Sequence, residues 1–431
     1  MPKIEKLGSD PNYYAKVVSL PRPLPHPNAD RLQVVTVDRQ PVITDAKAEE
    51  GDLYVYFPVD SALDERILRR LSLYRDSTLN QDPGKTGFFD PNGRVKAAKI
   101  RGVISQGFIL PADLVFALYS LRPADLSKFA GEYFDSIDGV RVSKKYVPPK
   151  PSGGAPSGGG KVVRGRSRMF DGQVRLHVDT LNLRRSHGWL TRETDVSITE
   201  KLHGTSFSAQ HVLVKRALSL LERLAVKIGI DVRETEYDVV ATSRRVIKGE
   251  YQKMGGGDYY KHDLYAETAL AIADVIPKGF AVYGEIVGYV TGSTQMIQKG
   301  YDYGCAPGEN RLFIYRVSAV NPEGVTVELT RLQVEEFCSD RGLTPVPLLY
   351  RGRAGNFSRL GEQFPDTPDG EDAWREAFLD QAEAMYASGK DCRWCRGKVP
   401  SEGCVVVRET SSRFDAHKLK SAEFVLRESG G

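Results

Sequence analysis

Short apolar and β-branched segments alternate with turn residues in the first third of the chain. They cover residues 14–19, 32–37, 53–57 and 103–110, and Pro, Gly and Asp residues separate them. Short runs of this kind, bounded by turns at close spacing, are typical of strands in small closed sheets. The pattern therefore predicts a small β-barrel in this part of the chain.

The pattern changes after about residue 169, where strand-like and helix-like segments are mixed. Strand-like runs lie at 196–199, 281–283, 312–315 and 404–407, whereas residues Ala217 to Ile230 follow the helical period. A mixture of this kind fits an antiparallel α+β domain. The overall fold class predicted from the pattern is α+β, with a barrel first and a mixed domain second.

A segment that cannot bury apolar surface separates the two patterns. Residues 150–160 read Lys-Pro-Ser-Gly-Gly-Ala-Pro-Ser-Gly-Gly-Gly, with Pro148 and Pro149 before them and basic residues after them. Such a sequence is typical of a flexible linker. We therefore expect a barrel domain at 1–145, a linker at 146–168 and an α+β domain at 169–431.

The composition supports this division and narrows the class of protein. A chain of 431 residues exceeds what one hydrophobic core usually organises. Its 60 Lys and Arg residues nearly balance its 56 Asp and Glu residues, so the net charge of +4 does not by itself indicate a polyanionic partner. The chain starts with polar residues and has no stretch of about 18 apolar residues, which favours a cytoplasmic protein.

The five cysteines lie in the last third of the chain and are odd in number. This is unlike a disulfide-stapled secreted domain, so we expect reduced thiols. Cys392 and Cys395 have the spacing of zinc ligands, and a structural zinc that also used Cys404, Cys338 or His417 is the alternative. No second pair with this spacing supports the zinc site.

The candidate for covalent chemistry is Lys201, in the segment Glu200-Lys201-Leu202-His203-Gly204-Thr205. A lysine that attacks a phosphate must be deprotonated, so its site has to lower a pKa that is normally about 10.4. A metal ion or nearby cations can do so, and Gly204 would let the backbone pass close to a nucleotide. Alone, the segment is weak evidence, because a solvated lysine before a turn explains it better.

Five later segments each supply a group that suits the same site, although each also has an ordinary structural interpretation. An exposed basic turn offers donors for ribose or phosphate, and two strand ends each carry a carboxylate next to glycine. One strand presents aromatic side chains two residues apart, and the last strand carries two lysines on one face. In chain order these residues are Arg244 or Arg245, Glu285, Phe313 with Tyr315, Glu402, and Lys418 with Lys420.

Together with the Lys201 segment, these segments resemble in order and spacing motifs I, Ia, III, IIIa, IV and V of the covalent nucleotidyltransferase superfamily of ligases and mRNA capping enzymes. The form Lys201-Leu202-His203-Gly204 is similar to that of RNA ligases that seal nicks. Residues 25–34, 95–96 and 99–103 resemble the OB-type tRNA-binding module of synthetases. This order of domains is similar to the ATP-dependent RNA ligase branch with an N-terminal OB domain and a C-terminal nucleotidyltransferase domain.

The resemblance implies an ATP-dependent RNA ligase that joins 3′-OH and 5′-phosphate ends, in nicks above all. Lys201 would become a lysyl-AMP, AMP would pass to the RNA 5′-phosphate, and the 3′-OH would then displace it. The implied partners are ATP, Mg²⁺ or Mn²⁺ and RNA, and we expect a monomer. A DNA or mixed-nick ligase, and a non-catalytic RNA-binding protein with a degenerate transferase domain, are the alternatives.

The roles implied for individual residues fall into four groups. The catalytic group is Lys201, Glu285, Glu402, Lys418 and Lys420. The nucleotide-binding group is Glu200, Leu202, His203, Gly204, Arg244, Phe313, Lys418 and Lys420. The metal-binding group is Glu285, Glu402 and His203, and the RNA-binding group is Lys96, Lys99 and Arg101.

Two features depart from the family pattern. Many ligases have Asp after the second aromatic residue of motif IIIa, where this chain has Arg316. A helix-like insertion, Val214 to Val232, also lengthens the interval between Lys201 and Arg244, which leaves the choice between Arg244 and Arg245 open.

Overall fold

The computed structural model describes residues 3–119, 125–148, 169–170, 172–248 and 264–430. Most of the predicted linker, from 149 to 168, lies outside the described residues. The chain divides into two units: residues 1–150, 184–186 and 420–431 form the first, and residues 151–183 and 187–419 form the second. The predicted boundaries at 145 and 169 stay a prediction. Within the described residues, no helix combines the length and apolar character that crossing a membrane requires.

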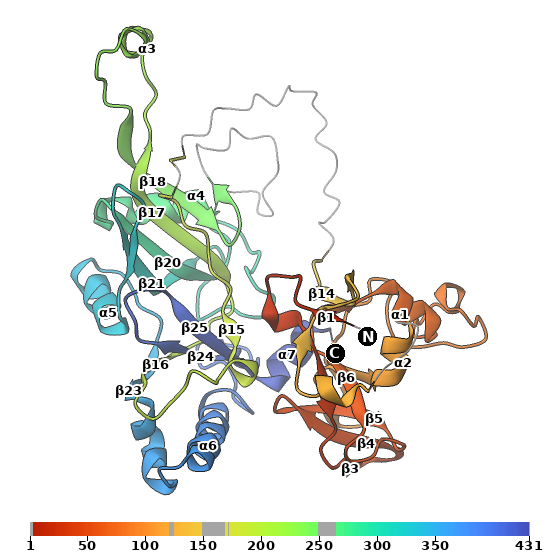
Figure 1. Ribbon diagram of the computed structural model, residues 1–431. Helices are drawn as coiled ribbons and strands as arrows, with labels where there is room; N and C mark the ends of the chain where they lie inside the picture. Colours follow the sequence, from red (N-terminus) through yellow and green to blue (C-terminus); the bar gives the residue numbers. More distant parts are fainter. Residues whose placement is uncertain (1–2, 120–124, 149–168, 171, 249–263, 431) are drawn as a thin grey trace. The chain divides into compact units, whose positions relative to one another are not determined.

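The first unit is built from short antiparallel strands (Figure 1). Its central sheet has the order β10-β6-β2-β11, and a second sheet has the order β3-β4-β5. The strands of these two sheets are β2 (Ala15–Ser19), β3 (Leu24–His26), β4 (Ala29–Val37), β5 (Gln40–Asp45), β6 (Leu53–Phe57), β10 (Phe108–Pro111) and β11 (Tyr133–Phe134). The remaining strands are β1 (Ile4–Glu5), β7 (Ser61–Leu63), β8 (Ala98–Ile100), β9 (Val103–Ser105), β12 (Ser136–Ile137), β13 (Val140–Arg141) and β14 (Ser143–Lys145).

The alternation of side chains along β2 and β6 gives this unit two hydrophobic cores. Val17 and Val55 belong to one core, whereas Val18 and Tyr56 belong to the other. Both faces of the strands are therefore buried, as expected where a sheet closes on itself. Helices α1 (Glu65–Arg70) and α2 (Ala112–Ala117) supply residues to the first core.

The predicted single strand at 103–110 is two strands, β9 and β10. Gly107 between them has φ +128°, and a Cβ there would lie 2.3 Å from the Tyr56 ring. The sharp bend at a position that only glycine fits ends one strand and begins the next.

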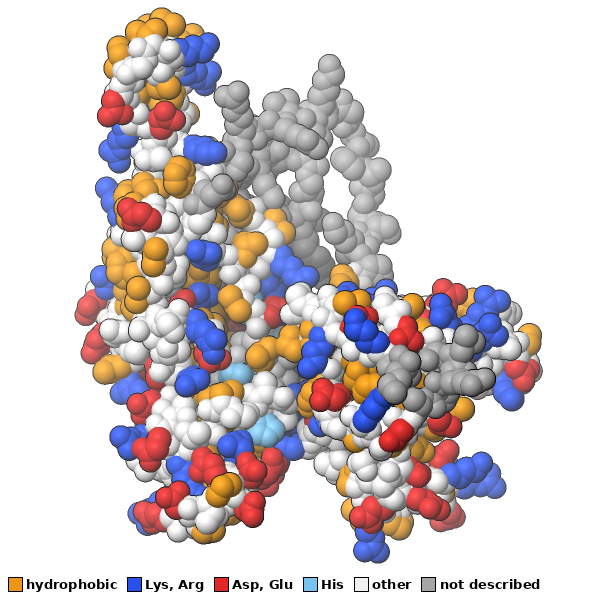
Figure 2. All heavy atoms as spheres, in the orientation of Figure 1, with side chains coloured by type: hydrophobic (Ala, Val, Ile, Leu, Met, Phe, Trp, Pro, Cys, Tyr) orange, Lys and Arg blue, Asp and Glu red, His pale blue; other side chains and the backbone are white. Residues whose placement is uncertain are grey.

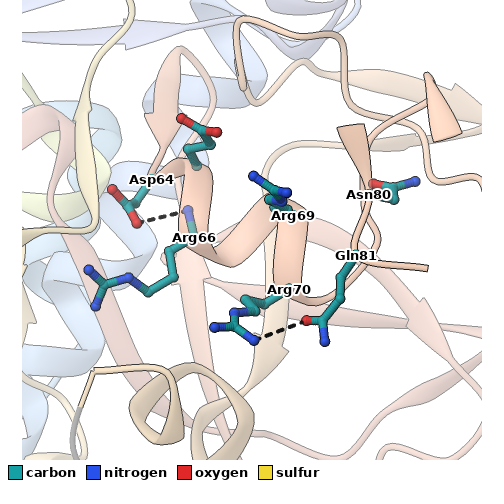
Figure 3. Close-up of a pocket in the computed structure, with 7 residues that line it drawn as sticks. Asp64, Arg66, Arg69, Arg70, Asn80 and Gln81 are labelled. Atoms are coloured by element: carbon teal, nitrogen blue, oxygen red, sulfur yellow. Dashed lines mark hydrogen bonds between the residues drawn. The ribbon is translucent and has the colours of Figure 1, made fainter. Parts of the chain in front are cut away.

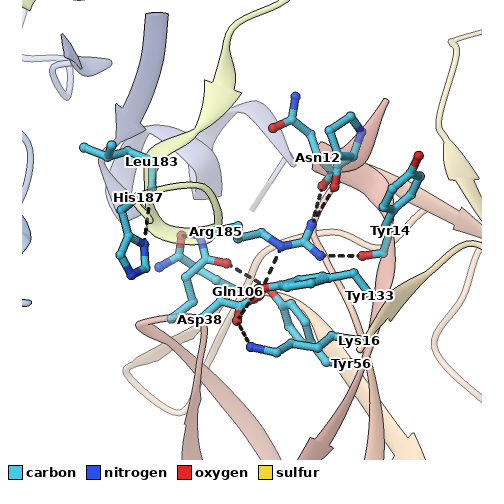
Figure 4. Close-up of polar contacts among 12 residues, drawn as sticks. Asn12, Tyr14, Lys16, Asp38, Tyr56, Gln106, Tyr133, Leu183, Arg185 and His187 are labelled. Carbon is cyan, nitrogen blue, oxygen red and sulfur yellow. Dashed lines mark hydrogen bonds and ion pairs between the residues drawn. The ribbon is translucent and has the colours of Figure 1, made fainter. Parts of the chain in front are cut away.

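Two distant segments of the sequence also belong to the first unit. Helix α7 (Ala422–Glu428) is followed by Ser429, whose Oγ accepts from the Ala97 amide at 3.0 Å. Arg185 donates to Asp38 Oδ2 at 3.0 Å and to the backbone oxygens of Asn12 and Tyr14 at 2.6 Å (Figure 4). These charge-assisted hydrogen bonds satisfy a buried guanidinium inside this unit.

The second unit contains two larger sheets. One has the order β19-β18-β17-β20-β21-β22, and its named strands pair antiparallel. The other has the order β15-β25-β24-β16-β23. The strands of the first sheet are β17 (Thr205–Lys215), β18 (Thr235–Ser243), β19 (Ile247–Lys248), β20 (Phe280–Gly288), β21 (Asn310–Val320) and β22 (Thr326–Glu328). Those of the second are β15 (Leu181–Asn182), β16 (Asp195–Glu200), β23 (Leu348–Arg353), β24 (Gly403–Arg408) and β25 (Asp415–Lys420).

Helices cover each of these sheets. Helices α4 (Leu264–Ile272) and α5 (Arg331–Asp340) share a core with the six-stranded sheet. Helix α6 (Pro368–Tyr386) packs Trp374, Phe378 and Leu379 against the five-stranded sheet. This mixed architecture confirms the predicted antiparallel α+β domain.

The chain passes from the five-stranded to the six-stranded sheet between β16 and β17, at residues 201–204. The segment that carries Lys201 is therefore a crossing between the two sheets.

The predicted helix at 217–230 is shorter than the pattern indicated. Helix α3 (Leu220–Lys227) lies at the tip of the β17–β18 hairpin, and β17 continues through Val214 to Lys215. A capping box of Ser219 and Glu222 begins the helix. Its leucines are exposed, as the hydrophobic side chains at the tip in Figure 2 show, so the helical period here does not mark a buried face.

Candidate active site

Lys201 is held next to the first residues of β24. Strand β16 pairs with β24, and the Lys201 amide donates to the Gly403 carbonyl oxygen at 2.9 Å. This pairing brings Glu402, which precedes β24, to the lysine: Lys201 Nζ lies 3.0 Å from Glu402 Oε1. Glu402 is only 5% exposed, so the ion pair is shielded from water. Two segments from distant parts of the sequence thus meet at one ammonium group.

His203 lies on the other oxygen of the same carboxylate. Its Nδ1 is 3.7 Å from Glu402 Oε2, and its ring meets the Tyr301 ring edge-on at 4.8 Å. The His203 amide donates to the Tyr303 hydroxyl at 2.5 Å. These contacts fix the turn that follows Lys201, while the buried Leu202 anchors it to the protein interior.

Glu285, on β20, binds the same turn from the six-stranded sheet. Its Oε1 accepts from the Gly204 amide at 3.0 Å, and its Oε2 accepts from Ser206 Oγ at 3.4 Å. A Cβ at Gly204 would lie 2.2 Å from the Ile286 carbonyl oxygen, so only glycine allows this approach. Burial raises the pKa of Glu285 to about 7, although the positive charge of Lys201 opposes the rise.

Glu285 and Glu402 are also coupled to each other, because the charge of Glu402 raises the pKa of Glu285. Two carboxylates and an imidazole around one lysine are donors that suit a hydrated divalent cation. Among the described residues, no three His, Cys, Asp or Glu side chains converge closely enough to hold a metal by themselves. Magnesium is usually bound by one or two carboxylates and keeps several of its waters, so Glu285 and Glu402 are donors of the type that it takes.

Lys418 and Lys420 lie on one face of β25, as predicted. Both are partly exposed, whereas Leu419 between them is fully buried. Strand β25 neighbours β24, so the two lysines lie in the same sheet as β16, which leads into Lys201. His417 faces the other way and pairs with Asp415 at 2.9 Å.

Arg244 follows β18 and pairs with Asp179, at 2.8 Å from Nε and 2.5 Å from Nη2. Arg245 lies 3.7 Å from the same carboxylate. Neither arginine is distinguished as a ligand for nucleotide by this arrangement, but Arg244 is the more firmly oriented of the two.

Two residues that the sequence did not indicate lie beside these groups. Burial, with the nearby charge of Arg244, lowers the pKa of His177 to about 4, and Lys201 adds to this effect. His177 Nδ1 lies 2.9 Å from the Tyr315 hydroxyl. His177 and Asp179 stand in an irregular segment without periodicity or motif, so no local pattern could have identified them.

Phe313 and Glu200 meet a loop that the motifs do not include. The Trp394 ring lies 6.1 Å from the Phe313 ring, and Trp394 Nε1 donates to Glu200 Oε2 at 2.9 Å. Arg393 donates to the same oxygen at 2.8 and 3.1 Å. Glu200 is therefore held in place by two residues that stand between Cys392 and Cys395.

Both thiols of this loop are free. The neighbouring Cys395 thiol lowers the pKa of Cys392 to about 7. Cys404 and Cys338 belong to two different hydrophobic cores, and His417 is paired with Asp415. The structure gives the zinc alternative no third ligand among the described residues.

Arg316, the departure from motif IIIa, has a structural role. It forms two hydrogen bonds with Glu328, at 2.8 and 2.5 Å, and lies over the Tyr283 ring at 4.2 Å and the Phe414 ring at 4.9 Å. The register of β20 and β21 shifts at Tyr315, so the alternation of side chains is broken there, and Tyr315 and Arg316 both contact the Phe414 ring. A buried ion pair thus takes the place of the acidic residue found in many ligases.

The residues expected to bind RNA belong to the first unit. Lys96 pairs with Asp90 at 2.6 Å, and Arg101 donates to the Asn28 carbonyl oxygen at 3.3 Å. Lys99 is exposed on β8. Their contact with RNA stays a prediction.

Comparisons with known proteins agree with this arrangement. A family model described as an OB-fold domain matches residues 15–112, and a family model described as RNA ligase matches residues 194–422. No match was found among curated protein sequences.

Several solved structures of an RNA ligase from Naegleria gruberi are similar. A variant with AMP and Mn has 15% identity and a TM-score of 0.53, over 96% of this chain and 98% of that chain. The same ligase with PPi has 15% identity and a TM-score of 0.54, over 97% of this chain and 99% of that chain. At this identity the likeness shows a shared fold. The two family models confirm the predicted order of an OB-type domain followed by an RNA ligase domain. Because the RNA ligase model spans more than half of the 431 residues, the chain belongs to the RNA ligase family.

Proposed function

We propose that this chain is an ATP-dependent RNA ligase that joins a 3′-OH to a 5′-phosphate, with Lys201 as the nucleophile. The observation that carries the proposal is the position of Lys201 Nζ, 3.0 Å from the buried Glu402, with Glu285 bound to the turn that follows. The two carboxylates come from different sheets and converge on the segment that passes from one sheet to the other.

In the first step, Lys201 Nζ attacks the α-phosphorus of ATP, forming the N–P bond and releasing pyrophosphate. The attacking amine must first lose a proton, and Glu402 Oε1 is the acceptor at 3.0 Å. Lys418 and Lys420 would bind phosphate oxygens, and Arg244 would bind ribose or phosphate. AMP then passes to the RNA 5′-phosphate, and attack by the 3′-OH joins the strands and releases AMP.

Glu285 and Glu402, with His203 beside the latter, would hold a divalent cation such as Mg²⁺ or Mn²⁺, which would neutralise charge on the phosphates. A similar structure, that of a Naegleria gruberi RNA ligase variant with ATP and Mn, supports this proposal. Phe313 would stack on adenine, while Glu200, Leu202 and Gly204 would line the nucleotide.

A sealing assay tests the proposed reaction. Duplexes with one nick are prepared with a 5′-phosphate and either an RNA or a DNA 3′-OH strand, and a 3′-phosphate strand serves as the matched control. We expect ATP-dependent joining of the RNA 3′-OH strand and none of the 3′-phosphate strand or by Lys201→Ala. Equal or faster joining of the DNA 3′-OH strand would instead support a DNA or mixed-nick ligase.

A further inference from the structure

Helix α1 of the first unit presents three arginines in a pocket of about 600 Å³ (Figure 3). Arg66, Arg69 and Arg70 stand at i, i+3 and i+4, so they are neighbours on the helix surface. Asn80 and Gln81 complete the far wall, and Asp64 and Glu65 lie at the start of the helix. The last turn of a helix favours cations such as Arg69 and Arg70, and Glu65 stands four residues before Arg69, so the helix itself tolerates this cluster of charge.

Carboxylates of the described residues do not pair with these three arginines. Other cations of this unit pair with carboxylates, as Arg94 does with Asp60 at 2.7 Å and Lys145 with Asp10 at 3.1 Å. Among the described residues, no ion pair with a carboxylate is found for Arg66, Arg69 or Arg70.

The three guanidinium groups differ in how they are held. Arg66 Nη1 donates to the Leu118 carbonyl oxygen at 3.4 Å, and its guanidinium lies over the Tyr119 ring at 4.9 Å. Arg70 Nη1 donates to Gln81 Oε1 at 3.5 Å, a long hydrogen bond. The structure gives the Arg69 side chain no such bond within the described residues. Since each guanidinium carries several N–H donors, most of these donors stay available to a ligand.

The two acidic residues of the lining, Asp64 and Glu65, are outnumbered by its three arginines. Asp64 caps the helix, because its Oδ1 accepts from the Arg66 amide at 3.0 Å and from the Tyr119 hydroxyl at 2.7 Å. Asn80 is engaged by backbone groups, donating to the Tyr74 and Lys85 carbonyl oxygens at 2.9 and 2.8 Å. The lining therefore offers a surplus of charged donors.

We propose that this arginine pocket binds phosphate groups of an RNA strand. Guanidinium groups pair with phosphate oxygens through two hydrogen bonds at once, and a cavity of about 600 Å³ accommodates a phosphate with its nucleoside. The inference rests on the proposed function, since it names the strand that such a ligase would hold. The pocket differs from the expected RNA contacts Lys96, Lys99 and Arg101, of which Lys96 is already paired with Asp90.

The test compares Arg66→Ala/Arg69→Ala/Arg70→Ala with a control of equal charge change, Lys6→Ala/Arg22→Ala/Lys47→Ala, whose residues are exposed in the same unit. Binding of the full chain to a fluorescent RNA oligonucleotide is measured by anisotropy at several salt concentrations. We expect the affinity of the pocket variant to fall at least tenfold. Its slope of log K against log salt should decrease by about 0.7 for each phosphate that the variant no longer binds.

Adenylylation of Lys201 by labelled ATP, without RNA, separates this inference from the proposed function, because it should be unchanged in the pocket variant. Unchanged RNA affinity and slope, or an equal fall in affinity in the control, would overturn the inference. The inference would also be overturned if ATP or inorganic phosphate stabilised the parent but not the pocket variant, while the two proteins bound RNA equally well. If the triple variant does not fold, Arg69→Ala alone is decisive, because this side chain forms no hydrogen bond or ion pair within the described residues; it should reduce the slope by about 0.7.

Discussion

Removing the carboxylate partner of Arg316 should destabilise the second unit more than almost any other single polar substitution. In Glu328→Ala the guanidinium of Arg316 stays buried, with side chains of the pair only 7% and 6% exposed in the parent. It would lose two charge-assisted hydrogen bonds, at 2.8 and 2.5 Å. Two such bonds are worth about 3–6 kcal/mol, and breaking a buried ion pair by removing one partner typically costs about 3–5 kcal/mol.

The expected decrease in the free energy of unfolding is therefore about 4 kcal/mol. For a domain of this size, 1 kcal/mol corresponds to about 2–4 °C, so the melting temperature should fall by about 8–16 °C. Differential scanning calorimetry measures this change. Arg316→Met/Glu328→Leu, which removes both charges and keeps apolar volume between Tyr283 and Phe414, should recover most of the stability.

Glu193→Ala is the matched control, because Glu193 pairs with Arg353 while their side chains are 76% and 60% exposed. An exposed pair contributes about 0–1 kcal/mol, so the melting temperature should change by less than about 4 °C. Equal shifts of the melting temperature in Glu328→Ala and Glu193→Ala would refute the role of the buried pair. A double substitution less stable than Glu328→Ala would refute it as well.

Three further predictions concern the site. Burial raises the pKa of Glu285 from 4.5 to about 7, so folding favours its protonated form and the metal-free protein should lose stability as pH rises from about 5 to 8. Urea unfolding measures the free energy of unfolding against pH, which should change less in Glu285→Gln; the same pH dependence in both proteins would contradict this prediction. Trp394→Phe removes the donor to Glu200 and should raise the KM for ATP about tenfold in adenylylation while changing kcat less; an unchanged KM refutes the assignment. Elemental analysis of the purified protein should find no stoichiometric zinc, and Cys392→Ser/Cys395→Ser should keep the parent's adenylylation rate. One zinc per chain would instead support the zinc site.

The sequence predicted the fold class and most strands because local patterns set them. Continuous apolar runs at 53–57 and 404–407 form strands β6 and β24. The helix at 217–230 was predicted too long, because the same helical period arises in α3, whose apolar side chains are exposed. The break between β9 and β10 at Gly107 depends on contact with the Tyr56 ring. Tyr56 lies far away in the chain, so the sequence around Gly107 does not indicate this contact.

The sequence also indicated the residues that meet at Lys201, because each lies in or next to a recognisable strand. It could not indicate His177, Asp179, Arg393 or Trp394, since these act through contacts between segments far apart in the chain. Arg316 was recognised as a departure, but its partner Glu328 lies on the next strand and only the sheet register brings the two together.

The central claim is that Lys201 forms a covalent bond to AMP. Three proteins are compared: the parent, Lys201→Ala and, as a matched control, Lys398→Ala, whose lysine is exposed. Each is incubated with Mg²⁺ or Mn²⁺ and ATP labelled at the α-phosphate, and is then run on a denaturing gel. Mass spectrometry identifies the labelled peptide. We predict label on the parent and on Lys398→Ala, none on Lys201→Ala, and AMP on the peptide that contains Lys201. Label that persists in Lys201→Ala, or a parent that takes up no label with either metal, would contradict the claim.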